Sequence, residues 1–152
     1  MGMFTWKIHI AAPPQAVFDA LADVPNHSSW ADDKSQLKIT PVSEGPPAVG
    51  SKYRSEQIFF GKKNSADLEI SAFEPPRKFA LSISQRPDGR ERDDHLTHTF
   101  TLTPDATGTM LVRDTTGDGN PLLGLIAFPA IKKNGYDSLK KLKAKLERAP
   151  AG

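Results

Sequence analysis

His98 is the residue of this 152-residue chain whose type and surroundings most favour chemistry. In the segment LTHTFTL, alternate residues of a strand point the same way, so His98 shares a face with Leu96 and Phe100. Its unperturbed pKa of about 6.5 suits proton transfer or hydrogen bonding to a ligand near neutral pH. A histidine on an apolar face is more often satisfied by a neighbour inside the core. Both interpretations stay open for His98, and Tyr53 is the other candidate catalytic residue.

The remaining histidines do not suggest a metal site. His95 and His98 are three residues apart on one predicted strand, so they face opposite sides and cannot easily bind the same ion. The chain has no cysteine, which excludes disulfides, thiolate nucleophiles and thiolate-bound metals. We therefore expect neither a metal nor a cofactor.

The acidic and serine residues lack the spacing of common catalytic motifs. The pairs Asp32-Asp33 and Asp93-Asp94 are adjacent, so their side chains diverge, and no second buried acid completes a glycosidase-like pair. No G-x-S-x-G sequence marks a nucleophilic serine, and the glycines do not form a phosphate-binding loop. Any reaction would depend on the shape of a cavity and one acid–base residue.

The elements that would position these residues follow from hydrophobic periodicity and from proline and glycine punctuation. Phe4, Trp6 and Ile8 alternate with polar residues as in a half-buried strand, and Pro14 suits the first turn of a helix. Short turns between successive strands favour an antiparallel sheet. Residues 1–152 are predicted to form one α+β domain. Strands are predicted near residues 4–10, 36–43, 51–60, 65–73, 78–85, 93–103 and 109–115, helices over 14–22 and 121–147, and a short helical turn ending near Trp30.

The alternation within each strand predicts which side chains face inward. The inner face is mostly apolar, whereas the threonines of residues 97–103 suit a solvated outer face. Apolar walls with a few polar groups are typical of small-molecule pockets. Leu68, Ile70 and Ala72 are expected to share the inner face, whereas the parity of Arg113 and Asp114 stays undecided. The predicted ligand-binding residues are Trp30, Tyr53, Gln57, Phe59, Leu68, Ile70, Phe79, Leu81, His98, Phe100 and Phe128.

Four segments carry a resemblance to a known superfamily. They are APPQAVFDALADVPNHSSW near the start, GPPAVGSKY, FEPPRKFAL, and SLKKLKAKLE near the end. Their order and spacing resemble the SRPBCC or START-like helix-grip superfamily, in particular its polyketide cyclase/dehydrase-like branch. The resemblance implies a curved antiparallel β-sheet wrapped around a long C-terminal helix, with two short helices after the first strand.

The resemblance also implies an internal cavity and three possible functions. The first is binding of a hydrophobic or aromatic small molecule, such as a lipid, a quinone or a polyketide-like compound, between the sheet and the C-terminal helix. The second is a polyketide cyclase or dehydratase that uses the same cavity, with His98 or Tyr53 as the acid–base residue. The third is a protein-interaction module that uses the outer sheet face or the basic helix.

The net charge of +2 conceals a basic C-terminal segment. Residues 131–152 hold seven basic and two acidic residues. No aromatic residues are interleaved with the lysines of residues 140–148, as single-stranded nucleic acid binding would require, so we expect a solvated helix face and no nucleic acid partner. Neither a secretory signal pattern nor an apolar run of membrane-spanning length is present, so we expect a cytoplasmic protein without stable membrane insertion. The oligomeric state is left open.

Overall fold

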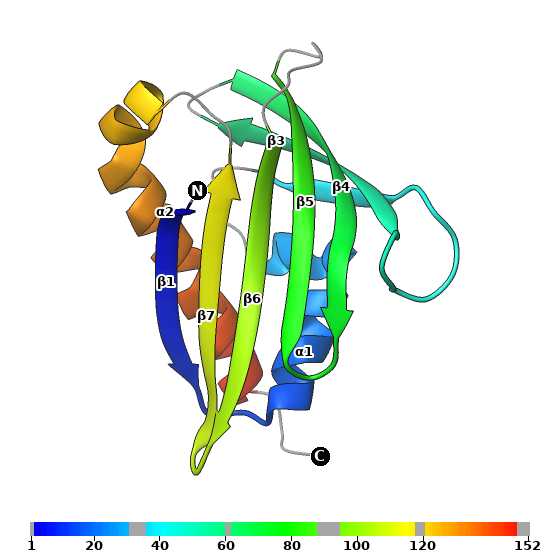
Figure 1. Cartoon of the computed structure of the whole chain (residues 1–152), viewed down its shortest axis with the longest axis vertical. Helices are drawn as coiled ribbons and strands as arrows, with labels where there is room; N and C mark the ends of the chain where they lie inside the picture. Colours follow the sequence, from blue (N-terminus) through cyan, green and yellow to red (C-terminus); the bar gives the residue numbers. More distant parts are fainter. Residues whose placement is uncertain (1, 31–35, 60–61, 88–94, 118–120, 149–152) are drawn as a thin grey trace.

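Over the residues that it describes, the computed structural model contains seven strands, two α-helices and one 3-10 helix (Figure 1). It describes residues 2–30, 36–59, 62–87, 95–117 and 121–148, without the side chains of residues 121–131, of Asn134 and of several strand residues. The strands are β1 (Gly2–Ile10), β2 (Lys38–Pro41), β3 (Lys52–Phe59), β4 (Lys62–Glu74), β5 (Lys78–Pro87), β6 (His95–Asp105) and β7 (Gly108–Gly117). The helices are α1 (Pro14–Ala22), η1 (Val24–Ser29) and α2 (Pro121–Arg148).

All neighbouring strands pair antiparallel, in the order β1-β7-β6-β5-β4-β3-β2. β1 therefore lies beside the last strand, while β2 to β7 follow one another as a meander. Figure 1 shows the sheet curving around α2, with α1 and η1 on the same side of the sheet. This is the predicted helix-grip architecture, and the described elements confirm it.

The helix α1 forms where the sequence predicted it because proline and hydrophobic spacing agree. Pro14 occupies the first helical position, where its missing N–H has no partner to lose. Val17, Phe18 and Leu21 recur at helical spacing and are fully or almost fully buried. The Phe18 ring packs edge-on against Phe73 and Phe79, with centroids 5.2 and 6.0 Å away. These contacts attach α1 to the concave face of the sheet.

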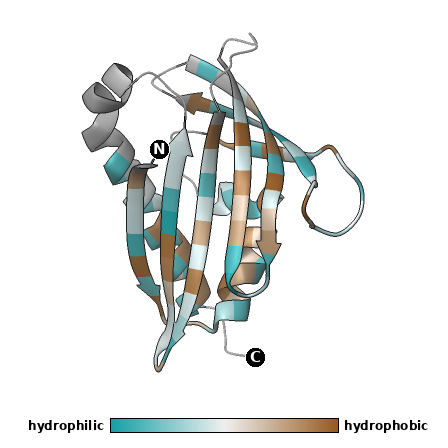
Figure 2. Ribbon diagram, in the orientation of Figure 1, coloured by the Kyte–Doolittle hydropathy of each residue, from teal (hydrophilic) through white to brown (hydrophobic). Residues whose placement is uncertain are grey.

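Burial alternates along β3, β7, the first part of β4 and the second part of β6, and Figure 2 shows bands of hydrophobic and hydrophilic residues along the strands. In β4 the register shifts between Ile70 and Ala72. This irregularity inserts one residue and exchanges the two faces beyond it. Phe73 pairs with Phe79 and meets it on the inner side, so the prediction that Ala72 continues the inner row is wrong.

The helix α2 is held against the sheet by leucines and by one glycine. Leu139 and Leu142 are completely buried, and Leu146 is partly buried against the same core. Gly135 lies directly against Trp6 of β1, so that a Cβ at this position would overlap the indole ring. The indole N–H of Trp6 donates to the Lys132 carbonyl at 3.0 Å. Trp6 is therefore fixed between helix and sheet.

No helix within the described ranges is long and apolar enough to cross a membrane.

Candidate ligand-binding cavity

A cavity of about 310 Å³ lies on the concave side of the sheet, between η1, the strands β2 to β7 and α2. Its volume is at the lower end of the range for small-molecule sites, about 300–1,000 Å³. Its wall is mainly apolar and includes serine, glutamine, histidine and arginine side chains. The lining residues are His27, Trp30, Leu37, Ile39, Ser55, Gln57, Ser65, Ala66, Leu68, Leu81, Ile83, Leu96, His98, Phe100, Arg113 and Ser138.

The structure brings six of the predicted ligand-binding residues together around this cavity: Trp30, Gln57, Leu68, Leu81, His98 and Phe100. Tyr53, Ile70 and Phe79 are buried in the core and do not line it. The side chains of Phe59 and Phe128 lie outside the described part of the structure, so these two predictions stay open. The alternation along the strands therefore predicted which side chains face the inside of the sheet, but not which of them border the cavity.

Phe79 lies in the core and packs against two residues of the cavity wall. Its side chain is completely buried, and its ring lies 6.2 Å from that of Phe100 and 6.5 Å from that of His27. Both of those residues line the cavity. Phe79 therefore fixes the positions of two wall residues without bordering the cavity.

Tyr53 is separated from the cavity by its position near the start of β3. It pairs with Leu68, and its side chain is buried in the core. Burial raises the pKa of its hydroxyl, so Tyr53 stays protonated at neutral pH. Of the two candidate catalytic residues, the structure places only His98 in the cavity wall.

His98 is held by a hydrogen bond and kept neutral by its surroundings. Its Nδ1 lies 2.7 Å from the hydroxyl of Thr115 on β7. Burial, followed by the positive charge of Arg113, lowers the pKa of His98 to about 3. A neutral imidazole can offer a ligand a donor or an acceptor, depending on its tautomer.

His27 of η1 is a second histidine in the wall. Its Nε2 donates to the Leu21 carbonyl at 2.6 Å, which leaves Nδ1 as an acceptor. Its ring packs on Trp30, with centroids 4.7 Å apart. Burial lowers the pKa of His27 from 6.5 to about 4. At neutral pH neither wall histidine carries a charge.

The described cavity wall includes one charged side chain, Arg113, whose parity the sequence left undecided. The alternating burial along β7 places Arg113 inward, while Asp114 faces outward and accepts a hydrogen bond from Thr5 Oγ1 at 2.7 Å. The Arg113 guanidinium lies over the ring of Trp6, 4.3 Å from its centroid. Burial lowers the pKa of Arg113 to about 10, so the group is still positive at neutral pH.

Acid should destabilise the fold between pH 6.5 and 4 because of these neutral histidines. The unfolded chain binds a proton at His27 near pH 6.5, whereas the folded chain does so only near pH 4. Stability is therefore complete above pH 6.5 and falls as the pH drops, by ~3 kcal/mol for His27 at ~1.4 kcal/mol per pKa unit. His98 adds to the loss in the same direction.

Urea unfolding of the wild type and a His27→Gln variant at pH 7.5, 5.5 and 4.5 measures this effect. Glutamine can still donate to the Leu21 carbonyl but does not titrate, so the variant should lose less stability between pH 7.5 and 4.5. Asp137 and Glu147 have lowered pKa values, and their contribution is lost only below about pH 4.5. Equal pH dependence in the two proteins would show that His27 is not the sensitive group.

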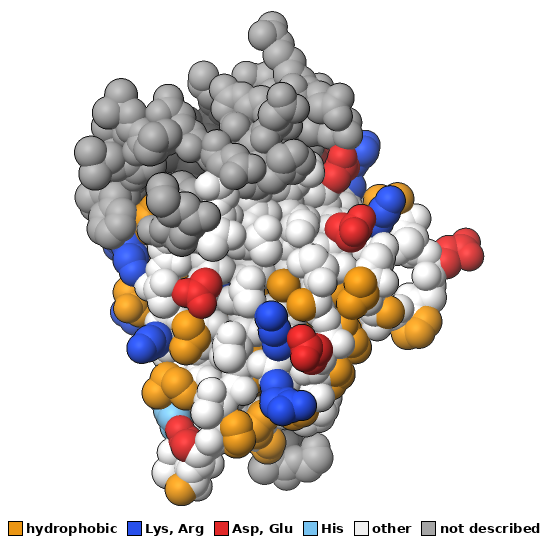
Figure 3. Space-filling model, in the orientation of Figure 1, with side chains coloured by type: hydrophobic (Ala, Val, Ile, Leu, Met, Phe, Trp, Pro, Cys, Tyr) orange, Lys and Arg blue, Asp and Glu red, His pale blue; other side chains and the backbone are white. Residues whose placement is uncertain are grey.

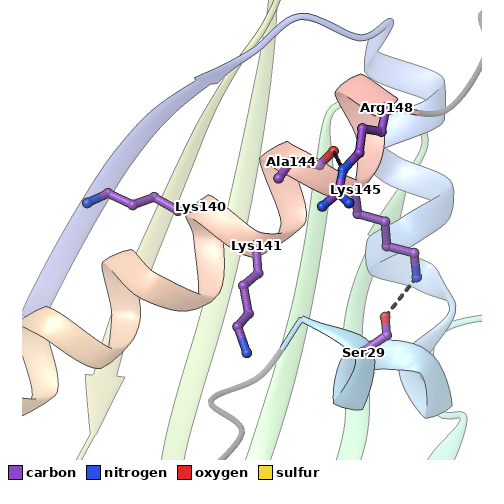
Figure 4. A pocket seen from close by; sticks show the side chains of 6 residues that line it. All are labelled: Ser29, Lys140, Lys141, Ala144, Lys145 and Arg148. Atoms are coloured by element: carbon purple, nitrogen blue, oxygen red, sulfur yellow. Dashed lines mark hydrogen bonds between the residues drawn. The ribbon is translucent and has the colours of Figure 1, made fainter.

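A second hollow, of about 730 Å³, lies between the C-terminal half of α2 and η1 and is open to solvent. It is lined by Ser29, Lys140, Lys141, Ala144, Lys145 and Arg148. Figure 4 shows Lys145 extending toward Ser29, to whose hydroxyl it donates at 2.7 Å, while Lys140 and Lys141 point in other directions. Lys140, Lys145 and Arg148 are exposed, as expected of a solvated helix face.

Within the described residues, no group of three or more histidine, aspartate or glutamate side chains is placed to hold a metal ion.

Comparison with known proteins identifies a family whose model matches this chain. A family model described as "Polyketide cyclase / dehydrase and lipid transport" matches residues 1–147. No curated protein sequence matches the chain.

Solved structures share the fold at low sequence identity. The protein CV1439 from Chromobacterium violaceum is 21% identical, with a TM-score of 0.73 over 96% of this chain and 98% of that one. The AHSA1 protein from Silicibacter pomeroyi is 18% identical, with a TM-score of 0.70 over 94% and 96%. DynU16, from the dynemicin biosynthetic locus, is 22% identical with a TM-score of 0.65, over 95% of this chain and 46% of that one.

Proposed function

The chain belongs to the polyketide cyclase / dehydrase and lipid transport family, and from this we propose that it binds a small hydrophobic or aromatic molecule in the cavity between the sheet and α2. Lipid-like, quinone-like and polyketide-like compounds are the candidate classes. We propose that residues 1–152 act as one domain in this role. The observation that carries the proposal is the cavity wall, where nine apolar side chains, seven of them from β2, β4, β5 and β6, stand beside seven polar ones.

The size of the cavity supports a compact ligand. At about 310 Å³ it is small for a sterol or a long acyl chain but suits one or two rings. Burial of ~300 Å² of apolar ligand surface contributes at most ~7 kcal/mol at ~25 cal/mol per Å². Loss of translational and conformational freedom offsets several kcal/mol of that, so we expect micromolar affinity.

Filling the cavity should abolish ligand binding. In a thermal-shift screen of aromatic, quinone and short-chain compounds, a ligand at 100 times its Kd should stabilise the wild type by ~2.7 kcal/mol, a rise of several degrees in Tm. Leu81→Trp places an indole in the space that the ligand needs, so this variant should show no shift.

The matched control is Ser82→Trp, which adds the same ring to the opposite face of the same strand. Trp is favoured in strands, so this variant should fold and keep the ligand-induced shift. A shift retained by Leu81→Trp, or lost equally in both variants, would contradict binding in this cavity.

Catalysis in the same cavity is the second candidate function. The observation in its favour is a neutral imidazole, His98, in the wall beside a cationic side chain, Arg113. An imidazole can transfer a proton while a cation stabilises a developing negative charge. If His98→Phe abolished turnover of a polyketide-like substrate without weakening its binding, the cyclase or dehydratase function would replace simple binding.

An interaction module has less support from the surface. The outer face of the sheet carries scattered apolar, basic and acidic side chains without one large apolar patch in the described part (Figure 3). The lysines of α2 are partly neutralised, because Lys133 and Lys143 pair with Asp137 and Glu147. We therefore propose a small-molecule partner rather than nucleic acid. We also propose that the protein is located in the cytoplasm.

A further inference from the structure

Arg113 is a buried cation without a counter-charge in the described structure. Only 9% of the residue is exposed, and its Nε is buried without a hydrogen-bond partner. None of the ion pairs that the described residues form includes it. The two titratable neighbours in the wall, His27 and His98, are neutral at pH 7 and provide no negative charge.

This arrangement is unfavourable for the empty protein. A buried charge without an ionic partner is strongly unfavourable, and a buried donor without an acceptor adds to that cost. The stack on Trp6 offsets only part of this cost by placing the cation over the aromatic ring. Stacking covers one face of the guanidinium, whereas its N–H groups point outward in the plane of the group. The buried N–H at Nε therefore still lacks an acceptor.

The position of Arg113 is well defined, as recognition of a charged group requires. Trp6 beneath it is fixed by Gly135 and by the hydrogen bond to the Lys132 carbonyl. On the neighbouring strand, Phe100 pairs with Arg113, and His98 lies two residues along on the same face. The cationic group and a neutral imidazole thus border one part of the cavity, and Trp30, Leu68 and Leu81 provide apolar wall.

We propose that the ligand is a small organic acid whose carboxylate pairs with Arg113 and whose apolar part fills the rest of the cavity. The planar guanidinium presents a fork of N–H donors that matches the two oxygens of a carboxylate. The ligand would bring both the missing negative charge and the missing acceptors. This inference rests on the proposed function, because it names the class of molecule that the same cavity takes.

Paired ligands that differ only in charge test the proposal. The probes are 2-naphthoate and 2-naphthamide, cinnamate and cinnamamide, and octanoate and octanamide, measured at pH 7.5 by calorimetry. Each acid has nearly the shape of its amide, so the ratio of the two Kd values isolates the contribution of the charge. A hydrogen bond to a charged group supports a ratio of about 10 to 100 in favour of the acid for the wild type.

Variants at Arg113 assign this preference to the residue. Arg113→Met keeps an apolar chain of similar length but no charge, so the ratio should fall to about 1. Arg113→Lys keeps the charge without the fork and should give an intermediate ratio. Because the substitution removes an unpaired buried cation, the ligand-free Arg113→Met variant should melt at the same or a higher temperature than the wild type.

The possible outcomes separate this inference from the proposed function. Equal affinity of the wild type for acids and amides would overturn the organic-acid ligand and leave hydrophobic binding intact. No binding of any pair or of any compound in the wider screen would overturn both. A large loss of stability in Arg113→Met, with the acid preference unchanged, would make Arg113 a structural residue and also overturn the inference.

Discussion

Replacement of Phe79 with alanine should lower the free energy of unfolding by about 3–5 kcal/mol, the range for removal of a large buried ring. Phe79 is completely buried and lies at the centre of an aromatic cluster with Phe18, Phe73 and Phe100. These rings come from α1 and from three neighbouring strands, so the loss cannot be filled by movement of one element. Urea denaturation with a linear extrapolation measures the change.

The matched control for this prediction is Phe79→Leu. Leucine keeps most of the buried apolar volume, so this variant should lose clearly less stability than the alanine variant. Phe79→Leu should also still bind the ligand, because Phe79 supports the wall without bordering the cavity. A loss below about 1 kcal/mol for Phe79→Ala would show that the cluster is not packed as described.

Leu142→Ala should cost about 2–5 kcal/mol for a related reason. Leu142 is completely buried where α2 packs on the sheet, and the contacts of this helix with β1 are the ones that also fix Trp6. Truncation leaves a cavity that the strands can close only in part, because β1 is paired with β7 and β7 is paired on both sides, which holds the sheet in place. The same urea titration gives the value.

Leu146→Ala serves as the comparison for Leu142. Leu146 is on the same helix but only partly buried, so the same truncation should cost less. Both changes replace leucine with alanine, the best helix former, so helix propensity does not separate them. A cost near zero at Leu142, or equal costs at both positions, would mean that α2 does not seal the core.

If the ligand is an organic acid as proposed, Arg113 links stability and function in this protein. A ligand-free fold that contains an uncompensated cation is less stable than one with an apolar residue there, yet that cation would give the cavity its selectivity. We expect Arg113→Met to keep or gain stability while it loses the preference for an acid over the corresponding amide. This combination distinguishes a residue kept for recognition from one kept for packing.

The sequence alone determined the elements and their order, because local chemistry sets them. Pro14 and the spacing of Val17, Phe18 and Leu21 predicted α1 to the residue. Alternation in residues 96–102 predicted the side on which His98 and Phe100 lie. Period-2 alternation and proline or glycine punctuation act over a few residues, so they can be recognised without any knowledge of distant contacts.

Only the tertiary structure decided which inward-facing side chains border the cavity and whether Arg113 or Asp114 faces it. Met110, Leu111 and Val112 are all apolar, so the local pattern cannot show to which side of the sheet Arg113 points. Its orientation follows from the pairing of β7 with the neighbouring strands, which places Arg113 between Trp6 and Phe100. The irregularity after Ile70 exchanges the faces of β4 and turns Phe73 inward. Phe79 and Tyr53 face inward as predicted but are covered by core side chains, and His27 reaches the wall because η1 packs there. Strand parity specifies a direction, whereas the curvature of the sheet and the helices packed on it determine which inward side chains border a cavity.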